Sequence, residues 1–312
     1  MRLLNQPEDA GAPGGKVCLA IGMFDGVHLG HQQVIGRTID DARQHEALAV
    51  VATFDRHPNC VVAPERAPKL LFPLAKKLRL IEGLGADAIW LIRFDPEFSR
   101  VSAEDFVRGF IRGFGRVQSL CVGGDFTFGH RRGGDVALLR RLGAELGFTV
   151  HGLSSVALDG APVRSTRIRE CVVRGDFDDA GQMLGRAYTL CGIVTVGDRL
   201  GRTLGFPTAN IDIEGLTVPP TGVYAVHVSL DGAMHRGVFN LGYRPTLARP
   251  ERVLRAEAHL FDYNGDLYGR EIEVAFVGRV RDERSFASLE ELRAQIERDT
   301  AAARRMFDDP AA

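Results

Sequence analysis

The sequence lacks the features that mark secreted, zinc-stapled or membrane proteins. Its five cysteines are scattered and form no Cys-x-x-Cys pair, which argues against a disulfide framework or structural zinc site and favours a reducing compartment. No segment approaches the run of about 18 apolar residues that a transmembrane helix needs. The first fifteen residues hold no apolar stretch suited to a signal peptide. We therefore expect a cytoplasmic protein without a membrane partner.

An excess of charge of one sign is also lacking. The 312 residues include 39 Lys and Arg against 40 Asp and Glu, for a formal net charge of −1. No global field would attract nucleic acid, so we expect no such partner, and any polyphosphate must be held by local groups. The sequence has neither internal repeats nor low-complexity segments. It is compatible with a monomer or a weak homo-oligomer.

The length suffices for two domains, and the strand pattern changes between them. Up to about residue 186, apolar runs alternate with helical stretches, which predicts a doubly wound α/β domain with a parallel sheet. Ligands of such sheets bind beyond the carboxyl ends of the strands. We expect strands at 17–21, 48–53, 88–92, 119–123 and 149–153, and helices at 31–44, 74–84, 103–114 and 136–147.

After Tyr188, strand-like runs follow one another across short turns, which predicts an antiparallel β-barrel. A last helix over 288–306 carries Leu289, Leu292 and Ile296 on one face, which we expect to pack on the barrel. We place the two domains at residues 1–186 and 187–312. The barrel strands are expected at 190–196, 224–230, 236–241, 256–261 and 271–276.

A glycine- and histidine-rich run at 22–31, Gly-Met-Phe-Asp-Gly-Val-His-Leu-Gly-His, joins the first predicted strand to its helix. His28 and His31 are three residues apart at the helix start and project to the same side. Gly26 and Gly30 allow close approach of a nucleotide, and the helix N-terminus favours phosphate. The alternative is a glycine-rich turn with two solvated histidines. The complete run after a strand favours the nucleotide site.

Further polar segments follow other strands at the same edge. Asp125, with Phe126 beside it, follows the fourth strand and is suited to a ribose hydroxyl or a flavin group, or to an ordinary turn. Asp55 and His57 follow the second strand, where a turn stiffened by Pro58 is the alternative.

The run Arg-Ser-Thr-Arg-Ile-Arg at 164–169 precedes a helix after the fifth strand. Its hydroxyl and guanidinium groups suit a triphosphate, since arginine binds phosphate oxygens bidentately. Taken alone, the run is also explained by a helix cap beside a charged face. Together with the other two segments it favours a phosphate site.

These residues resemble the nucleotidyltransferase superfamily, which shares its His-x-Gly-His with class I tRNA synthetases. The resemblance is closer to the FAD synthetase module of bacterial bifunctional riboflavin kinase/FAD synthetases. A tRNA synthetase is disfavoured by the lack of a basic surface and an anticodon-binding domain. One departure is Arg164, where the family usually has serine. The resemblance implies catalytic roles in positioning and charge stabilisation for His28, His31 and Arg167, ATP contacts for Gly22, Phe24, Asp25, Gly30, Ser165, Thr166 and Arg169, and flavin contacts for Asp55, His57, Asp125 and Phe126.

A second glycine-rich run follows the first barrel strand. Gly197, Gly201 and Gly205 recur every four residues, so backbone N–H groups can surround phosphates. The run matches neither a Walker A loop nor a Rossmann fingerprint. It ends in Pro-Thr-Ala-Asn, where Thr208 and Asn210 face the same way in an extended strand and offer oxygens to Mg²⁺. The alternative is a glycine-rich hairpin ending in a proline turn.

Downstream, Glu257 and His259 share one face of a predicted strand. A carboxylate on an inner barrel face is costly without a purpose. Glu257 is suited to accept the proton of a sugar-chain hydroxyl that attacks the γ-phosphorus of ATP, with a surface salt bridge as the alternative. We expect His259 to be a structural, hydrogen-bonded residue.

These motifs resemble the riboflavin kinase module of the same family, and the combined resemblance covers roughly residues 16–300. It implies riboflavin, FMN and ATP as substrates, FMN and FAD as products, and Mg²⁺ as cofactor. The implied residues are Glu257 as catalytic base, Thr208 and Asn210 for the metal, Gly197, Gly201, Arg202, Gly205 and Pro207 for ATP, and Asn240, Arg281, Glu283 and Phe286 for flavin.

Three functions remain open from the sequence. The leading one is successive catalysis, from riboflavin and ATP to FMN and then from FMN and ATP to FAD. The second is a chain in which Arg164 impairs the first module and only the kinase works. The third is a flavin-binding regulatory protein without turnover, against which the intact Glu257, Thr208 and Asn210 argue.

Overall fold

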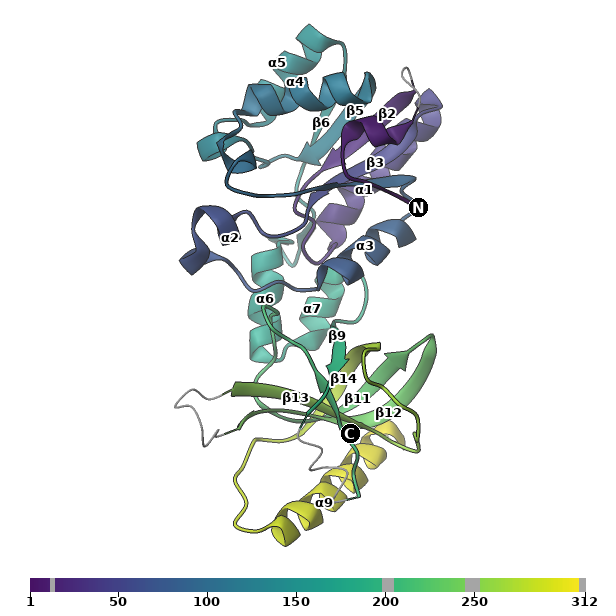
Figure 1. Cartoon of the computed structure of the whole chain (residues 1–312), viewed down its shortest axis with the longest axis vertical. Coiled ribbons are helices and arrows are strands. Elements are labelled where there is room, and N and C mark those ends of the chain that lie inside the picture. Colours follow the sequence, from purple (N-terminus) through teal and green to yellow (C-terminus); the bar gives the residue numbers. More distant parts are fainter. Residues whose placement is uncertain (12–14, 198–204, 245–252, 309–312) are drawn as a thin grey trace. The chain divides into compact units, whose positions relative to one another are not determined.

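The computed structural model describes residues 1–11, 15–197, 205–244 and 253–308 (Figure 1). The chain divides into two compact units. The first comprises Met1–Ile168 with Met183–Gly185, and the second comprises Arg169–Gln182 with Arg186–Ala312. Among the described residues, no helix is long and apolar enough to cross a membrane.

The first unit is built on a six-stranded sheet in the order β1-β4-β3-β2-β5-β6, in which every pair of neighbours is parallel. The five strands predicted from the sequence are confirmed to within three residues at each end. The additional edge strand, β1, is three residues long and too short to show a period. The strands are β1 (Arg2–Leu4), β2 (Lys16–Ile21), β3 (Leu48–Phe54), β4 (Ala88–Ile92), β5 (Arg116–Gly123) and β6 (Thr149–Leu153).

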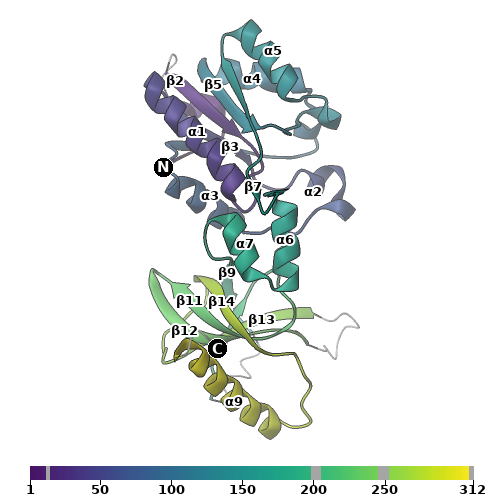
Figure 2. The same ribbon diagram turned by 180° about the vertical axis from the view of Figure 1, so that it is seen from behind.

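Helices cover both faces of this sheet, as the doubly wound prediction requires. Leu19 and Ile21 of β2 join one apolar cluster with α4 and α5, whereas Cys18 and Ala20 join another with α1 and α3. Figure 2 shows α1 lying across one face. The helices are α1 (Leu29–His45), α2 (Asn59–Val62), α3 (Leu74–Gly83), α4 (Ala103–Phe114) and α5 (Val136–Leu146).

The position of the first site follows from the strand order. The chain runs from β2 outward through β3 to β4, and then returns to β5 on the other side of β2. The direction in which successive strands are added to the sheet therefore reverses between β2 and β5. Open α/β sheets bind their ligands at this point, beyond the carboxyl ends of the strands. The histidine run follows β2, and Asp125 follows β5.

The second unit contains a closed antiparallel barrel in the order β10-β13-β12-β11-β14-β9. Five barrel strands were predicted, and the sixth, β10, has only three residues and carries Asn210. Helices α6 (Ser165–Arg174) and α7 (Phe177–Leu184) precede the barrel, and α6 crosses the boundary between the units. The strands are β9 (Thr189–Thr195), β10 (Ala209–Ile211), β11 (Gly222–Leu230), β12 (Ala233–Arg244), β13 (Val253–Leu260) and β14 (Glu271–Arg281).

The last helix, α9 (Leu289–Asp308), packs against β11, β12 and β14 (Figure 1). The predicted packing face is partly wrong. Leu289 is 57% exposed because it stands at the first turn, whereas Gln295, Asp299 and Ala303 are buried. Two polar residues, Gln295 and Asp299, therefore occupy the inner face of α9.

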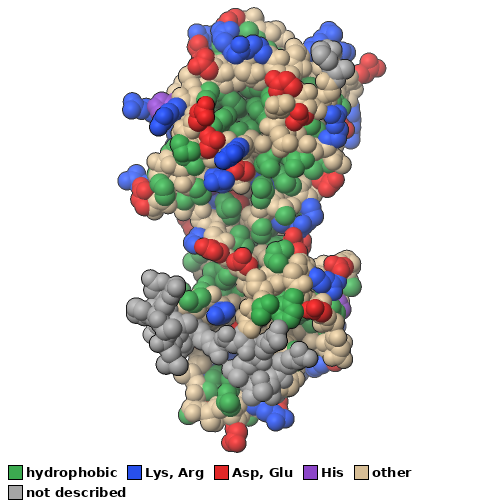
Figure 3. All heavy atoms as spheres, viewed as in Figure 1, with side chains coloured by type: hydrophobic (Ala, Val, Ile, Leu, Met, Phe, Trp, Pro, Cys, Tyr) green, Lys and Arg blue, Asp and Glu red, His purple; other side chains and the backbone are tan. Residues whose placement is uncertain are grey.

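Charged side chains of both signs are interspersed over the face drawn in Figure 3. This distribution agrees with the net charge of −1. On this face, a bound polyanion would thus have to be held by particular groups rather than by a broad basic surface.

Candidate active sites

The loop between β2 and α1 holds an unusual backbone conformation. Phe24 and Val27 have φ angles of 50° and 42°, in the left-handed region, which is rare for a β-branched residue such as Val27. Both side chains are at most 2% exposed, so packing fixes the loop. Strain that surrounding packing maintains is typical of functional sites.

This loop brings the two histidines together at the start of α1. His28 is the N-cap residue, and its Nδ1 accepts a hydrogen bond from the backbone N–H of His31 at 3.4 Å. The two rings are stacked, with centroids 3.6 Å apart and planes 18° apart. A Cβ at Gly30 would lie 3.3 Å from Cε1 of His28, so the missing side chain makes room for this ring. The side chains of His28 and His31 therefore lie on the same side of the start of α1, as predicted.

The environment of His31 keeps its ring neutral. Burial, with His28 and Lys77 adding to it, holds the pKa of His31 well below its ordinary value of 6.5. Its Nδ1 is buried and has no hydrogen-bond partner among the residues described. At neutral pH, His31 can therefore act on a ligand by hydrogen bonding rather than by carrying a charge.

Lys77, on α3, was not predicted from the sequence. It is 4% exposed, and its Nζ donates to Phe54 O at 2.8 Å, Thr53 Oγ1 at 3.1 Å and Met23 O at 3.3 Å. Burial lowers its pKa from 10.5 to about 8, although Asp25 and Asp55 oppose this effect. The ammonium group thus joins the loop after β2 to the end of β3.

The run at 164–169 lies beside the histidine loop, as predicted. The hydroxyl of Ser165 donates to the backbone carbonyl of Asp25 at 2.9 Å. The Asp25 carboxylate is buried and accepts from the backbone N–H of Leu71 at 3.0 Å, so it also fixes the loop. Two motifs separated by about 140 residues therefore meet at one edge of the sheet.

The other predicted residues of this edge have partners within the first unit. Asp55 accepts from the backbone N–H of Phe94 at 2.9 Å, and His57 Nδ1 accepts from the backbone N–H of Asn59 at 3.1 Å. Asp125, after β5, forms an exposed ion pair with Arg164 at 3.2 Å. The residue that departs from the family pattern is thereby tied to a predicted flavin contact.

Phe126 and the residues of α6 differ in their exposure and partners. Phe126 stacks on Phe128 at 5.5 Å. Thr166 is exposed. Arg167 donates to Leu158 O at 3.0 Å and to Ala161 O at 3.3 Å, in the hairpin of β7 (Ala157–Leu158) and β8 (Ala161–Pro162). Arg169 lies farther along α6, in the part that belongs to the second unit.

The barrel contains a cavity of about 260 Å³. The residues predicted to hold the metal, the base and the flavin share this one cavity, although four separate segments of the chain contribute them. The predicted residues that line it are Thr208, Asn210, Asn240, Glu257, His259, Arg281, Glu283 and Phe286.

The barrel register brings Glu257 of β13 between Asn210 of β10 and Asn240 of β12. A Cβ at Gly197 would lie 2.1 Å from Nδ2 of Asn210, so glycine is required for Asn210 to take its position. Hydroxyl, amide and carboxylate oxygens form a donor set that Mg²⁺ prefers. The residues present therefore fit a magnesium ion. His259 has the structural role expected, since its Nδ1 lies 2.8 Å from Pro207 O.

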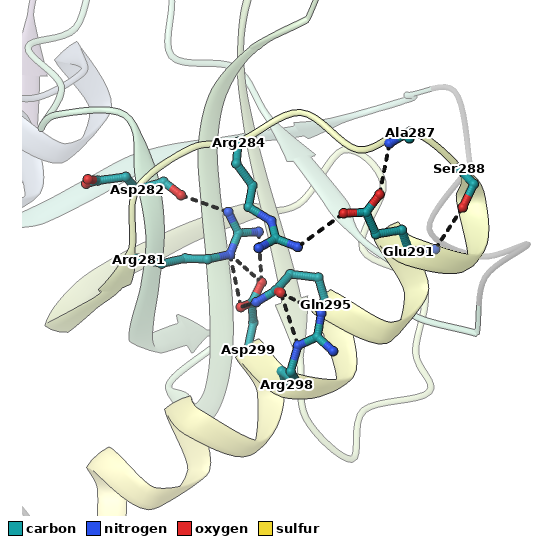
Figure 4. A network of polar contacts seen from close by, with 9 residues as sticks. All are labelled: Arg281, Asp282, Arg284, Ala287, Ser288, Glu291, Gln295, Arg298 and Asp299. Carbon is teal, nitrogen blue, oxygen red and sulfur yellow. Dashed lines mark hydrogen bonds and ion pairs between the residues drawn. The ribbon is translucent and has the colours of Figure 1, made fainter.

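The segment after β14 is held against α9 by a polar network (Figure 4). Asp299 accepts from Arg281 Nε at 3.0 Å, and the ion pair to Nη2 measures 2.9 Å. Glu283 accepts from the backbone N–H of Tyr243 at 2.7 Å. Phe286 lies beneath the guanidinium of Arg284, 4.7 Å from its ring centroid. Asp299 is buried on α9 because it binds Arg281, which explains the polar inner face.

A second cavity, of about 490 Å³, adjoins the first through Thr208, which lines both. Pro207 and Tyr268 also line it. Gly205 has a φ of 89°, which suits glycine, in the segment leading to Pro207. The predicted ATP residues Gly201 and Arg202 lie outside the described residues.

The comparison with known families matches both halves of the chain. A model described as FAD synthetase matches residues 13–167, and one described as riboflavin kinase matches residues 184–307. A bifunctional riboflavin kinase/FMN adenylyltransferase of Pseudomonas fluorescens is 42% identical over 296 residues, 94% of each chain. The chain belongs to this family. The protein of the same name from Escherichia coli K12 is 39% identical and covers 95% of this chain and 94% of its own.

The crystal structure of a protein named as a macrolide-efflux protein, from Streptococcus pneumoniae, is similar to this riboflavin kinase/FMN adenylyltransferase family member throughout. It is 28% identical, with a TM-score of 0.79, and the match covers 97% of this chain and 98% of that one. That name differs from those of the sequence relatives. The likeness supports the combination of an α/β part and a barrel in one chain.

In this family member, sequence reasoning found the motifs but missed the residues that fix them. Lys77 could have been noticed, because it lies four residues before the buried Ile81 and so falls on the apolar face of its helix. Gln295 and Asp299 gave a similar signal within the last helix. A charged or amide residue on an apolar face calls for a buried partner.

Proposed function

We propose that this chain phosphorylates riboflavin to FMN in the barrel cavity and then adenylylates FMN to FAD at the carboxyl edge of the sheet. The first reaction is assigned to residues 187–312 and the second to residues 1–186, and we expect both to take place in the cytoplasm. The observation that carries the proposal is the single cavity lined by Thr208, Asn210 and Glu257. In it, oxygen atoms suited to bind Mg²⁺ lie near a carboxylate suited to act as a base.

In the kinase step, the carboxylate of Glu257 accepts the proton of the terminal ribityl hydroxyl. That oxygen attacks the γ-phosphorus of ATP, and ADP leaves. Thr208 and Asn210 would hold Mg²⁺, which neutralises phosphate charge when bound. We assign the flavin to Asn240, Arg281, Glu283 and Phe286, and ATP to the adjoining second cavity with Pro207, Gly197, Gly201, Arg202 and Gly205.

In the adenylylation step, an ionised phosphate oxygen of FMN attacks the α-phosphorus of ATP and pyrophosphate leaves. No strong general base is needed, because the second pKa of such a phosphate is about 6. Positioning and charge stabilisation are required instead. We assign these roles to His28, His31 and Arg167, with ATP contacts from Gly22, Phe24, Asp25, Gly30, Ser165, Thr166 and Arg169, and flavin contacts from Asp55, His57, Asp125 and Phe126.

The test is to incubate the purified protein with riboflavin, ATP and Mg²⁺ and to separate the products by chromatography. FMN and ADP should appear first, followed by FAD and pyrophosphate. A parallel incubation with FMN and ATP tests the second reaction alone. FMN production without any FAD in either incubation would favour the kinase-only alternative, and absence of both products would refute the proposal.

A further inference from the structure

Three arginines line the barrel cavity, and they differ in their partners. Arg281 is paired with Asp299 at 2.9 Å, and Arg284 lies 3.6 Å from Glu291. The Nε of Arg255 is buried and has no hydrogen-bond partner among the residues that the structure describes. A buried N–H without an acceptor costs free energy, and a ligand that supplies an acceptor would recover it.

The position of Arg255 along β13 shows which part of a ligand it faces. Every second residue of a strand faces the same side, so one face of β13 presents Arg255, Glu257 and His259. All three line the cavity. His259 is bonded to Pro207, on the side of the second cavity. Arg255 pairs with Gly242 instead, where a Cβ would lie 2.4 Å from Glu283 Oε1. Arg255 is therefore on the far side of Glu257 from the proposed ATP position.

The spacing suits the two ends of riboflavin. Two residues of an antiparallel strand span about 6.8 Å, and an extended ribityl chain covers a comparable distance. With its terminal hydroxyl at Glu257, the molecule would carry its ring system to Arg255. Of the two ring carbonyls, the one at C2 lies on the same side of the ring system as N10, which bears the ribityl chain, with C10a and N1 between them. The edge formed by N1 and the C2 carbonyl is therefore the acceptor edge nearest to Arg255 in this orientation.

A second polar atom of the cavity supports the same orientation. Thr300 lines the cavity from α9, and its Oγ1 is buried without a partner among the described residues. Two buried polar atoms of one cavity, both without a partner among the described residues, indicate a ligand with a polar edge.

We propose that Arg255 is a specificity-determining residue of the kinase reaction, whose Nε–H donates to the C2 carbonyl of the isoalloxazine ring, with Thr300 Oγ1 bonding the same edge. This inference rests on the proposed riboflavin kinase activity. Arg255 binds the substrate and takes no part in the transfer of the phosphoryl group.

The first test is the steady-state kinetics of FMN formation in Arg255→Met, which keeps the apolar stem and removes the donors. Loss of one charged donor to the carbonyl should raise the KM for riboflavin by about tenfold to a hundredfold. The KM for ATP and kcat should stay near the wild-type values. Arg293→Gln, on an exposed arginine of α9 that pairs with Glu297, is the matched control and should change none of the three parameters.

The second test replaces the acceptor instead of the donor. The unaltered enzyme should use riboflavin better than 2-thioriboflavin, because sulfur is the poorer acceptor, and this preference should disappear in Arg255→Met. Thr300→Val should raise the KM for riboflavin with a smaller effect. An unchanged KM in Arg255→Met, or equal use of both flavins by the unaltered enzyme, would overturn the inference. Failure of the unaltered enzyme to form FMN would instead overturn the proposed function.

Discussion

Glu257 of β13 lies directly opposite Asn210 of β10, and both side chains line the barrel cavity. The pairing puts the carboxylate of Glu257 next to the amide of Asn210, in the cavity that Thr208 also lines. The proposed base and the two proposed metal ligands thus share a site that hydrogen bonds between strands keep in register. Substitutions here can separate the roles of the three residues.

Glu257→Gln removes the proton acceptor and keeps the shape of the side chain. We expect FMN formation to fall at least about 100-fold, the low end for loss of a general base. Adenylylation of supplied FMN should be unaffected, and both rates can be measured on one preparation. Equal damage to the two reactions would argue against independent sites.

Asn210→Ala should lower the affinity of the kinase site for Mg²⁺. Loss of an oxygen ligand should raise the Mg²⁺ concentration needed for half-maximal FMN formation at least about tenfold. Asn59→Ala, in the first unit, serves as the control. A lower rate with an unchanged magnesium dependence would show that Asn210 does not hold the metal.

His31→Ala should have the opposite selectivity to the Glu257 variant. Removal of one donor to developing charge typically costs about 100-fold or more, so FAD synthesis from supplied FMN should fall by that amount while FMN formation persists. His45→Ala, at the other end of α1, is the matched control. Undiminished FAD synthesis in His31→Ala would remove this histidine from the site.

Lys77→Met should change how the stability of the first unit depends on pH. The pKa of Lys77 is about 8 when folded and 10.5 as the ordinary value. Below pH 8, both states carry the proton and the cost of burying it is fully present. Between pH 8 and 10.5 the unfolded chain binds more protons, so the wild-type free energy of unfolding rises with pH.

The difference of 2.5 between the two pKa values corresponds to about 3 kcal/mol. The methionine variant should lack this rise. Denaturant unfolding can be followed by the fluorescence of Trp90, the single tryptophan, which lies in β4 of the first unit. A constant difference between the two proteins from pH 7 to pH 10 would contradict the expectation.

Arg164→Ser restores the residue usual in the family and breaks the pair with Asp125. Both side chains are more than half exposed, so the free energy of unfolding should change by less than about 1 kcal/mol. We expect FAD synthesis to continue in both proteins. Synthesis that appears only in the serine variant would show that Arg164 impairs the first site.

The sequence predicted the long, strongly periodic elements well and the short ones poorly. β4 and β6 begin and end where expected, because apolar runs bounded by turn residues define them. β1 and β10 have three residues each, too few for any period, and exist because longer neighbours offer them hydrogen-bonding edges.

The candidate sites show the same division. Motifs such as the paired histidines and Pro-Thr-Ala-Asn could be read directly, because their chemistry lies in adjacent residues. Lys77 and Asp299 act through partners 24 and 18 residues away, and no local pattern specifies such pairs. Arg255 was missed because its significance lies in the absence of a partner among the described residues.

The brevity of β10 has a consequence for how the barrel responds to its substrates. Three residues join β9 to β13 and complete the ring of hydrogen bonds, and the middle one is Asn210. A ligand that binds Asn210 therefore acts on the shortest strand of the barrel. Nucleotide binding should stabilise the pairing of β10 with its neighbours and slow proteolytic cleavage near it. The rate of cleavage would then report whether the site is occupied.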